Sequence, residues 1–241
     1  MSLINYPYIM LFQPATYRSY PAISNSDLIE FERFLTATPN KTPVAAYAEG
    51  SAFHQMVLEP RCGRPIPADI DRERLTKMAT AVRATRFGRW ALQWGQKEQP
   101  HLFRDPETGL LCKCQTDLRL RHGLIVDIKT TRARTYQQFL ECCELYQYDR
   151  QTAFYLDGLN AKRFVLLGVQ KTAPFQVFYF EPTADATGNA FIEQGRERYK
   201  RLLALLAKSS FQPSSWATAA ASTPRYRNAI IDNAIPNRVY V

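Results

Sequence analysis

The sequence predicts an α/β protein that forms one elaborated domain. Apolar residues recur at helical spacing before residue 96, three strand-like runs follow in the middle of the chain, and further helices and strands come after them. With 241 residues, 46% of them hydrophobic, the chain can bury a substantial core and is not disordered as a whole. We expect an N-terminal arm over residues 1–22, the domain over residues 23–216, and a linker and tail over residues 217–241.

The N-terminal half of the domain is predicted to be helical. The first helix starts at Ser24, and Asp27 three residues later completes a capping-box pattern. A second helix covers residues 44–58, where alanines and Met56 recur at helical spacing until Pro60 ends the run.

A single long helix is expected over residues 71–96. It carries three arginines at every third position, Arg83, Arg86 and Arg89. This stripe is either a solvated helix face, since arginine is a good helix former, or a surface that contacts DNA phosphates.

The middle and C-terminal parts supply the strands and the remaining helices. Strands are predicted over residues 98–104, 110–120 and 124–131, separated by the turn signals DPETG and HG. The later elements are predicted as helices over residues 136–145 and 149–159, strands over 164–170 and 175–181, and a last helix over 189–208.

Composition and missing motifs exclude several classes of protein. The net charge of +9, from 31 Lys+Arg and 22 Asp+Glu, favours a polyanionic partner. The chain has no GxGxxG, GxxxxGK[ST], GxSxG or HExxH run, so the usual dinucleotide-binding, P-loop, serine-hydrolase and zincin functions are not indicated. No membrane span or secretory signal is recognisable, and we expect a cytoplasmic protein. Five cysteines without a CxxC pair are expected to be core thiols rather than metal ligands.

Several candidate functional side chains lie on the hairpin predicted over residues 110–131. Alternation puts polar side chains on one face of each strand, Lys113, Gln115, Asp117 and Arg119 on the first and Asp127 and Lys129 on the second. A three-residue loop, Arg121-His122-Gly123, would pair Asp117 directly with Asp127, with their Cβ atoms about 5 Å apart, whereas a two-residue loop would separate them. In this register the two acids are close enough to share a hard cation, and like charges held that close need either a metal or a proton.

Residues outside the hairpin could complete a site. Gln151 and Tyr155 stand at i and i+4 on one predicted helix, and His54 follows Gly50 by four residues on another. Each of them alone is more often structural than functional, and surface hairpins often carry Asp and Lys as solvent-facing polarity.

In this order the motifs resemble those of the PD-(D/E)xK nuclease superfamily, and more closely its exonuclease VIII-like (RecE-type) branch of phages and prophages. The matching segments are ISNSDL, EGSAFHQMVLEP, DPETGLLCKCQTDLRL, LIVDIKTT, YDRQTAFYLDGL and FVLLGVQKTAPFQVFYF. The resemblance implies a restriction-endonuclease-like core, in which helices flank a central mixed β-sheet. The chain departs from the family pattern at Gln115-Thr116, where Arg-Pro is usual, and at Asp127, where Glu is commoner.

The resemblance also implies roles for individual residues. It implies metal binding by Asp117 and Asp127, helped by the Ile128 carbonyl, and catalysis by Lys129. His54 is implied as a contact to metal or phosphate, and Glu98 occupies an acidic position near the metal. Gln151 and Tyr155 would support catalysis by positioning Lys129 and the DNA backbone. The basic side chains expected to contact DNA are Arg83, Arg86, Arg89, Lys113 and Arg119.

The function implied is that of an exodeoxyribonuclease that depends on Mg²⁺, or on Mn²⁺, and not on ATP. It would degrade linear double-stranded DNA from the 5′ end and leave 3′ single strands for a recombination annealing protein. The resemblance further implies a ring-shaped homo-oligomer threaded by DNA, in the bacterial host cytoplasm if the chain is phage-encoded. Two other functions stay open: a RecB-type nuclease module that serves a helicase or defence partner, and a non-catalytic module that binds DNA ends. The tail over residues 217–241 is either a docking segment or unstructured.

Overall fold

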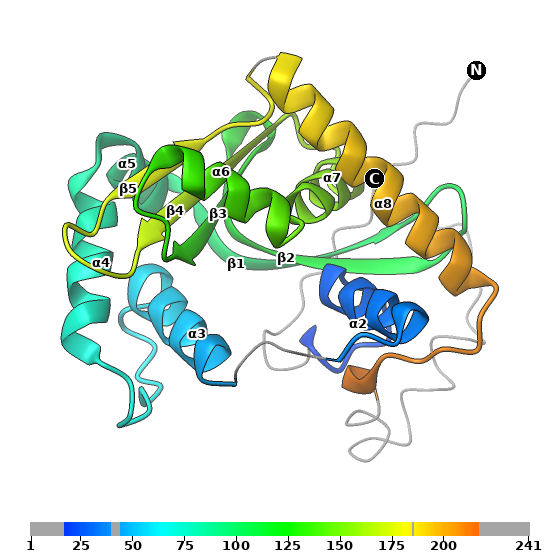
Figure 1. Ribbon diagram of the computed structural model, residues 1–241, viewed down its shortest axis with the longest axis horizontal. Helices are drawn as coiled ribbons and strands as arrows, with labels where there is room; N and C mark the ends of the chain where they lie inside the picture. The colour runs from blue at the N-terminus through cyan, green and yellow to red at the C-terminus, as the bar shows by residue number, and fades with distance from the viewer. Residues whose placement is uncertain (1–16, 40–43, 185, 217–241) are drawn as a thin grey trace, which may run out of the picture.

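A five-stranded β-sheet runs through the molecule, with helices on both of its faces (Figure 1). The computed structural model describes residues 17–39, 44–184 and 186–216. Most of the predicted arm, residues 1–16, and the predicted tail, residues 217–241, lie outside the described residues. The arrangement confirms the predicted α/β class with a central mixed sheet flanked by helices.

The strands follow the order of the chain across the sheet. They are β1 (Gln96–Arg104), β2 (Leu111–Leu120), β3 (Leu124–Thr131), β4 (Arg163–Gln170) and β5 (Val177–Phe180). The first three form the predicted antiparallel meander, β4 lies parallel to β3, and β5 is antiparallel to β4. The parallel pair requires a crossover connection, and two helices between β3 and β4 provide it.

The helices divide between the two faces of the sheet. They are α2 (Asn25–Thr36), α3 (Val44–Leu58), α4 (Arg72–Ala84), α5 (Arg86–Trp94), α6 (Tyr136–Leu145), α7 (Tyr148–Gly158) and α8 (Ala186–Ala207). Helices α3, α4 and α5 pack on one face, and α2, α6, α7 and α8 pack on the other. Among the residues that the structure describes, no helix is both long and apolar enough to cross a membrane.

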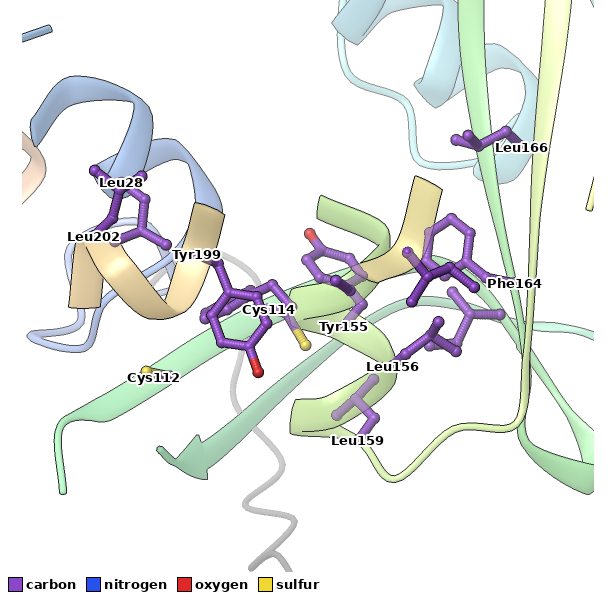
Figure 2. Close-up of a cluster of buried hydrophobic side chains, with 14 of the residues drawn as sticks. Leu28, Cys112, Cys114, Tyr155, Leu156, Leu159, Phe164, Leu166, Tyr199 and Leu202 are labelled. Carbon is purple, nitrogen blue, oxygen red and sulfur yellow. The ribbon is translucent and has the colours of Figure 1, made fainter. Parts of the chain in front are cut away.

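Strand β4 shows how the sheet forms two cores. Phe164 and Leu166 point into the cluster shared with α7 and α8, whereas Val165 and Leu167 point into the cluster shared with α3 and α4. Alternate residues of a strand point to opposite faces, so a strand covered on both sides is apolar throughout. Figure 2 shows the first of these clusters, to which α2, β2, α7, β4 and α8 contribute side chains.

The hairpin between β2 and β3 has the predicted register. A 3-10 turn over Arg121–Gly123 connects the strands, and Leu120 pairs with Leu124 on either side of it. Gly123 adopts the expected left-handed conformation, with a φ of 70°, and His122 before it also has a positive φ, 59°. The ladder of pairs ends at Leu118 and Val126, so Asp117 and Asp127 occupy the next positions.

Strand β2 departs from the predicted alternation. Cys112 and Cys114 lie in the cluster with α7 and α8, whereas Leu118 and Leu120 lie in the cluster on the opposite face. The change of face falls between Cys114 and Leu118, where the pairing of β2 with β1 is interrupted at Glu98, a residue with a positive φ. The single polar face predicted along the whole strand is therefore wrong.

The helix predicted over residues 71–96 is two helices. Thr85 between α4 and α5 has an extended backbone; its hydroxyl donates to the Val82 carbonyl at 2.8 Å and accepts from the Gly88 amide at 3.0 Å. Thr85 is thus the N-cap of α5. The predicted stripe of three arginines is broken, because Arg83 lies on α4 while Arg86 and Arg89 lie on α5.

Lys113 is buried, with 2% of its surface exposed. Its ammonium donates to the carbonyl oxygens of Tyr17, Arg18 and Tyr20 at distances of 2.8 to 3.0 Å. An ammonium has three donors, and these contacts use all of them. The predicted contact between Lys113 and DNA is therefore wrong: this side chain fastens the segment before α2 to strand β2.

Candidate active site

The candidate site lies where β2 and β3 separate. Beyond the last paired residues of the hairpin, the Asp117 carboxylate on β2 accepts a hydrogen bond from the Ile128 amide of β3 at 2.7 Å. Asp117 and Asp127 are both buried. The carboxylate satisfies a backbone donor that the interrupted ladder leaves free, so the strand geometry fixes its position.

Asp117 also belongs to a cluster that draws on three elements. His54 of α3 has its Nδ1 atom 3.3 Å from an Asp117 oxygen, and Glu98 of β1 completes the group. One potential ligand atom from each of the three residues lies within 4.8 Å of the others. Carboxylate oxygens suit Mg²⁺ and Mn²⁺, and imidazole suits many divalent metals, so the donor set fits a divalent cation.

Glu98 reaches this cluster through an unusual backbone. Its φ is 49°, in the left-handed region that residues other than glycine rarely adopt. The pairing of β1 with β2 includes Lys97 with Leu118 and Gln99 with Thr116 but skips Glu98. The Glu98 side chain hydrogen-bonds to the Gln115 amide. Such a conformation costs about 1–3 kcal/mol and is typical of functional sites, so it supports a role for Glu98.

A second network surrounds Lys129. The Lys129 ammonium lies 2.7 Å from one Asp127 oxygen and donates to the Gln151 side-chain oxygen at 2.9 Å. The Gln151 amide nitrogen donates to the other Asp127 oxygen at 2.8 Å. Asp127 thus binds Lys129 and Gln151, and it is not among the residues that cluster with His54.

Helix α7 supplies two aromatic residues to the site. The predicted Tyr155 donates its hydroxyl to the Gln115 carbonyl at 3.2 Å, so it supports β2 rather than Lys129. Tyr148 was not predicted, and its ring centre lies 4.9 Å from the Lys129 ammonium. The spacing of Tyr148 and Gln151, i and i+3 on one helix, is the sequence signal that could have identified it.

The pKa values of the cluster are strongly perturbed. Burial alone would lower the pKa of His54, but the neighbouring Asp117 carboxylate raises it to about 9. Burial, and next the charge of Asp117, raise the pKa of Glu98 to about 7. Burial also raises the pKa of Asp127, despite the opposing charge of Lys129. Carboxyl groups with such raised pKa values are concentrated at functional sites.

The other predicted DNA contacts have different surroundings. Arg83 donates to the Met56 carbonyl near the end of α3 at 2.9 Å, which gives it a structural role. Arg86 and Arg89 are exposed on α5, and Arg119 is half-buried on β2. Of the five basic residues predicted to contact DNA, Arg86 and Arg89 are thus the exposed ones that have no structural contact of this kind with another described residue.

Residues 43–217 match the family model described as PDDEXK-like domain of unknown function (DUF3799). The chain belongs to this family. The match covers most of the described residues and confirms the resemblance to the PD-(D/E)xK superfamily. No curated protein matches the sequence of this DUF3799 chain.

Solved structures are similar to this DUF3799 chain at low sequence identity. A protein from Eubacterium rectale, assigned as an exonuclease, is 12% identical, with 95% of this chain and 94% of that one covered and a TM-score of 0.56. The alkaline exonuclease LHK-Exo from Laribacter hongkongensis is 13% identical, with 84% and 94% covered and a TM-score of 0.38. A phage-related exonuclease from Haemophilus somnus 129PT is 13% identical, with 83% and 96% covered and a TM-score of 0.36. The likeness to the first shows a common fold.

Proposed function

We propose that this chain is a metal-dependent nuclease that hydrolyses phosphodiester bonds of DNA. The observation that carries the proposal is the junction of β2 and β3, where buried Asp117 and Asp127 lie beside Lys129. A lysine and two acids at the point where two strands separate form the arrangement that the PD-(D/E)xK motif describes. The match to a PDDEXK-like family supports the same activity.

His54, Glu98 and Asp117 would hold the cation, and Asp127 and the Ile128 carbonyl are proposed as further ligands. A bound divalent metal makes its water acidic and polarises the phosphate. Each Asp127 oxygen has one partner, Lys129 or Gln151, and keeps a second lone pair that can bind a cation. We therefore propose that Gln151 keeps Asp127 oriented between the cation and Lys129.

Lys129 supplies positive charge to the reacting phosphate in this proposal. Burial acts to lower the pKa of Lys129, but the charge of Asp127 raises it overall, so the ammonium stays protonated at neutral pH. Its position is set by Asp127, Gln151 and the Tyr148 ring. A preorganised charge stabilises the negative charge that develops in the transition state.

The finer activity follows from the resemblance to the exonuclease VIII-like branch. We propose Mg²⁺, or Mn²⁺, as the metal and linear double-stranded DNA as the substrate. The proposed direction is 5′ to 3′, without ATP, and the 3′ strand that remains would serve recombination. We place the catalytic domain within residues 23–216 and expect a ring-shaped homo-oligomer, which light scattering in solution would test.

The test uses blunt linear duplex DNA labelled at either the 5′ or the 3′ ends, beside a closed circle, with Mg²⁺ or EDTA and no ATP. We expect loss of the 5′ label from linear DNA when Mg²⁺ is present and no loss in EDTA. Asp127→Asn should lower the rate by about a hundredfold or more, because it removes a charge that the site requires. Asp69→Asn, at an exposed position, is the matched control. Metal-dependent cleavage that survives Asp127→Asn would refute the site, and cleavage of the circle would indicate an endonuclease.

A further inference from the structure

Helix α5 exposes large aromatic side chains to solvent. Trp90 is 43% exposed and Trp94 is 67% exposed. Phe87, Trp90 and Trp94 follow one another at i, i+3 and i+7 and therefore lie along one side of the helix. The Phe87 ring lies 5.6 Å from that of Trp90 and 4.9 Å from that of Tyr179 on β5. The rings thus form a supported row rather than isolated exposed residues.

Arg86 and Arg89 alternate with these rings along the helix. Both side chains are exposed, and neither is in an ion pair with a residue in the described part of the chain. Other arginines differ in this respect: Arg163 and Arg196, for example, are paired with Glu181 and Asp157. We call Arg86, Phe87, Arg89, Trp90 and Trp94 together the α5 stripe.

The α5 stripe ends four residues before Glu98 of the candidate active site. Trp94 is the last residue of α5, and Glu98 of the metal cluster follows four residues later. Gly95 between them packs so closely on Leu118, the neighbour of Asp117, that an added Cβ would lie 3.0 Å from its side chain. The C-terminal end of α5 is therefore fixed against the strand that carries Asp117.

We propose that the α5 stripe binds single-stranded DNA beside the active site. Bases would stack on Trp90 and Trp94, and phosphates would contact Arg86 and Arg89. The two tryptophans lie about 6 Å apart along the helix axis, which exceeds the spacing of about 3.4 Å between stacked bases, so each ring can receive its own base. This inference rests on the proposed function, because removal of one strand of a duplex frees the other strand.

The combination of groups favours a single strand over other occupants. A duplex keeps its base faces stacked inside, so the exposed rings would have nothing to stack on. A second copy that docked on this stripe around a two-fold axis would bring the arginines of both copies together, with repulsion between like charges. A single DNA strand offers both base faces and phosphates.

The test measures binding of a labelled 20-nucleotide oligodeoxythymidine to the full chain by fluorescence anisotropy in EDTA, where the proposed hydrolysis is blocked. Trp90→Ala with Trp94→Ala should weaken binding by about tenfold or more, because both rings on which bases would stack are removed. Arg86→Gln with Arg89→Gln should also weaken it. Leu205→Ala, at an exposed position on α8, is the control for the tryptophan change and should leave binding unchanged.

Tryptophan fluorescence and the hydrolysis assay distinguish the possible outcomes. In the native chain, oligodeoxythymidine should quench tryptophan fluorescence, and absence of quenching would overturn the proposal. If the tryptophan variants bind the oligonucleotide like the native chain, the stripe is not a DNA surface. The same conclusion holds if the substitutions alter the oligomeric mass of the protein and leave oligonucleotide binding unchanged. The native chain could show no metal-dependent hydrolysis while the variants still bind the oligonucleotide more weakly than the native chain does. In that case the binding surface stands and the proposed nuclease activity fails.

Discussion

At the scale of single residues, Lys129 is held by groups of three chemical kinds: a carboxylate, an amide and an aromatic ring. Asp127 and Gln151 lie within hydrogen-bonding distance of the ammonium, and the ring of Tyr148 packs against it. A half-buried ammonium that loses one of these partners gains freedom to move. Tyr148 is therefore a positioning residue in the proposed reaction.

Substitution of Tyr148 tests this role. Tyr148→Phe keeps the ring face and should leave the hydrolysis rate within about twofold, whereas Tyr148→Leu should lower kcat by about tenfold or more, because a desolvated cation–π contact contributes about 2 kcal/mol. Tyr146→Leu changes the neighbouring exposed tyrosine and serves as the control. Kinetics at saturating DNA, with Tm measured beside them, check the prediction. Equal losses with Phe and Leu would assign the effect to the hydroxyl instead.

Glu98 gives a prediction about metal affinity. Glu98→Gln keeps the hydrogen-bonding partner of Gln115 but removes a negative ligand oxygen, so the affinity for Mn²⁺ should fall by about tenfold or more. Calorimetric titration of the DNA-free chain with Mn²⁺ measures this without relying on activity. Glu107→Gln, in an exposed turn, should bind Mn²⁺ like the native chain. An unchanged affinity in Glu98→Gln would remove this residue from the metal site.

At the scale of elements, the sequence predicts what local chemistry determines. The register of the hairpin follows from the three-residue turn that ends in Gly123, and the first helix starts at the Ser24 capping box as predicted. The break at Thr85 escaped prediction because apolar residues continue at helical spacing across it. The position of Lys113 could not be predicted, since its carbonyl partners lie more than ninety residues away in the chain.

The same substitution, glycine to alanine, should have opposite effects at the start of α5 and inside α3. An alanine Cβ at Gly88 would lie 2.3 Å from the Val82 carbonyl oxygen, so Gly88→Ala should destabilise the fold by about 1–3 kcal/mol. Apart from the adjoining backbone of α3 and the two neighbouring residues, no atom of the described residues lies within 4 Å of such a Cβ at Gly50. Gly50→Ala should therefore stabilise the fold by about 0.5–1 kcal/mol. Urea unfolding measures both, and stabilisation by Gly88→Ala would show that α5 does not need its close approach to Val82.

At the scale of the whole molecule, the net charge of +9 does not identify the Lys and Arg side chains that would contact DNA in the proposed function. Lys113 is enclosed by carbonyl groups, and Arg150 is buried with Glu32 as its partner. Charges of this kind add to the total but cannot displace counterions from a bound strand. The accessible positive charge must come from exposed side chains such as Arg86 and Arg89, which have no ion-pair partner among the described residues.

The salt dependence of DNA binding separates local contacts from total charge. Each phosphate neutralised on a single strand adds about 0.7 to the slope of log affinity against log salt concentration. Arg86→Gln with Arg89→Gln should therefore make the slope for oligodeoxythymidine shallower by about 1.4. Arg201→Gln with Lys208→Gln removes the same charge from exposed positions at α8 and should leave the slope unchanged. Equal changes in both double variants would mean that the overall charge of the molecule, and not contact at α5, governs the binding.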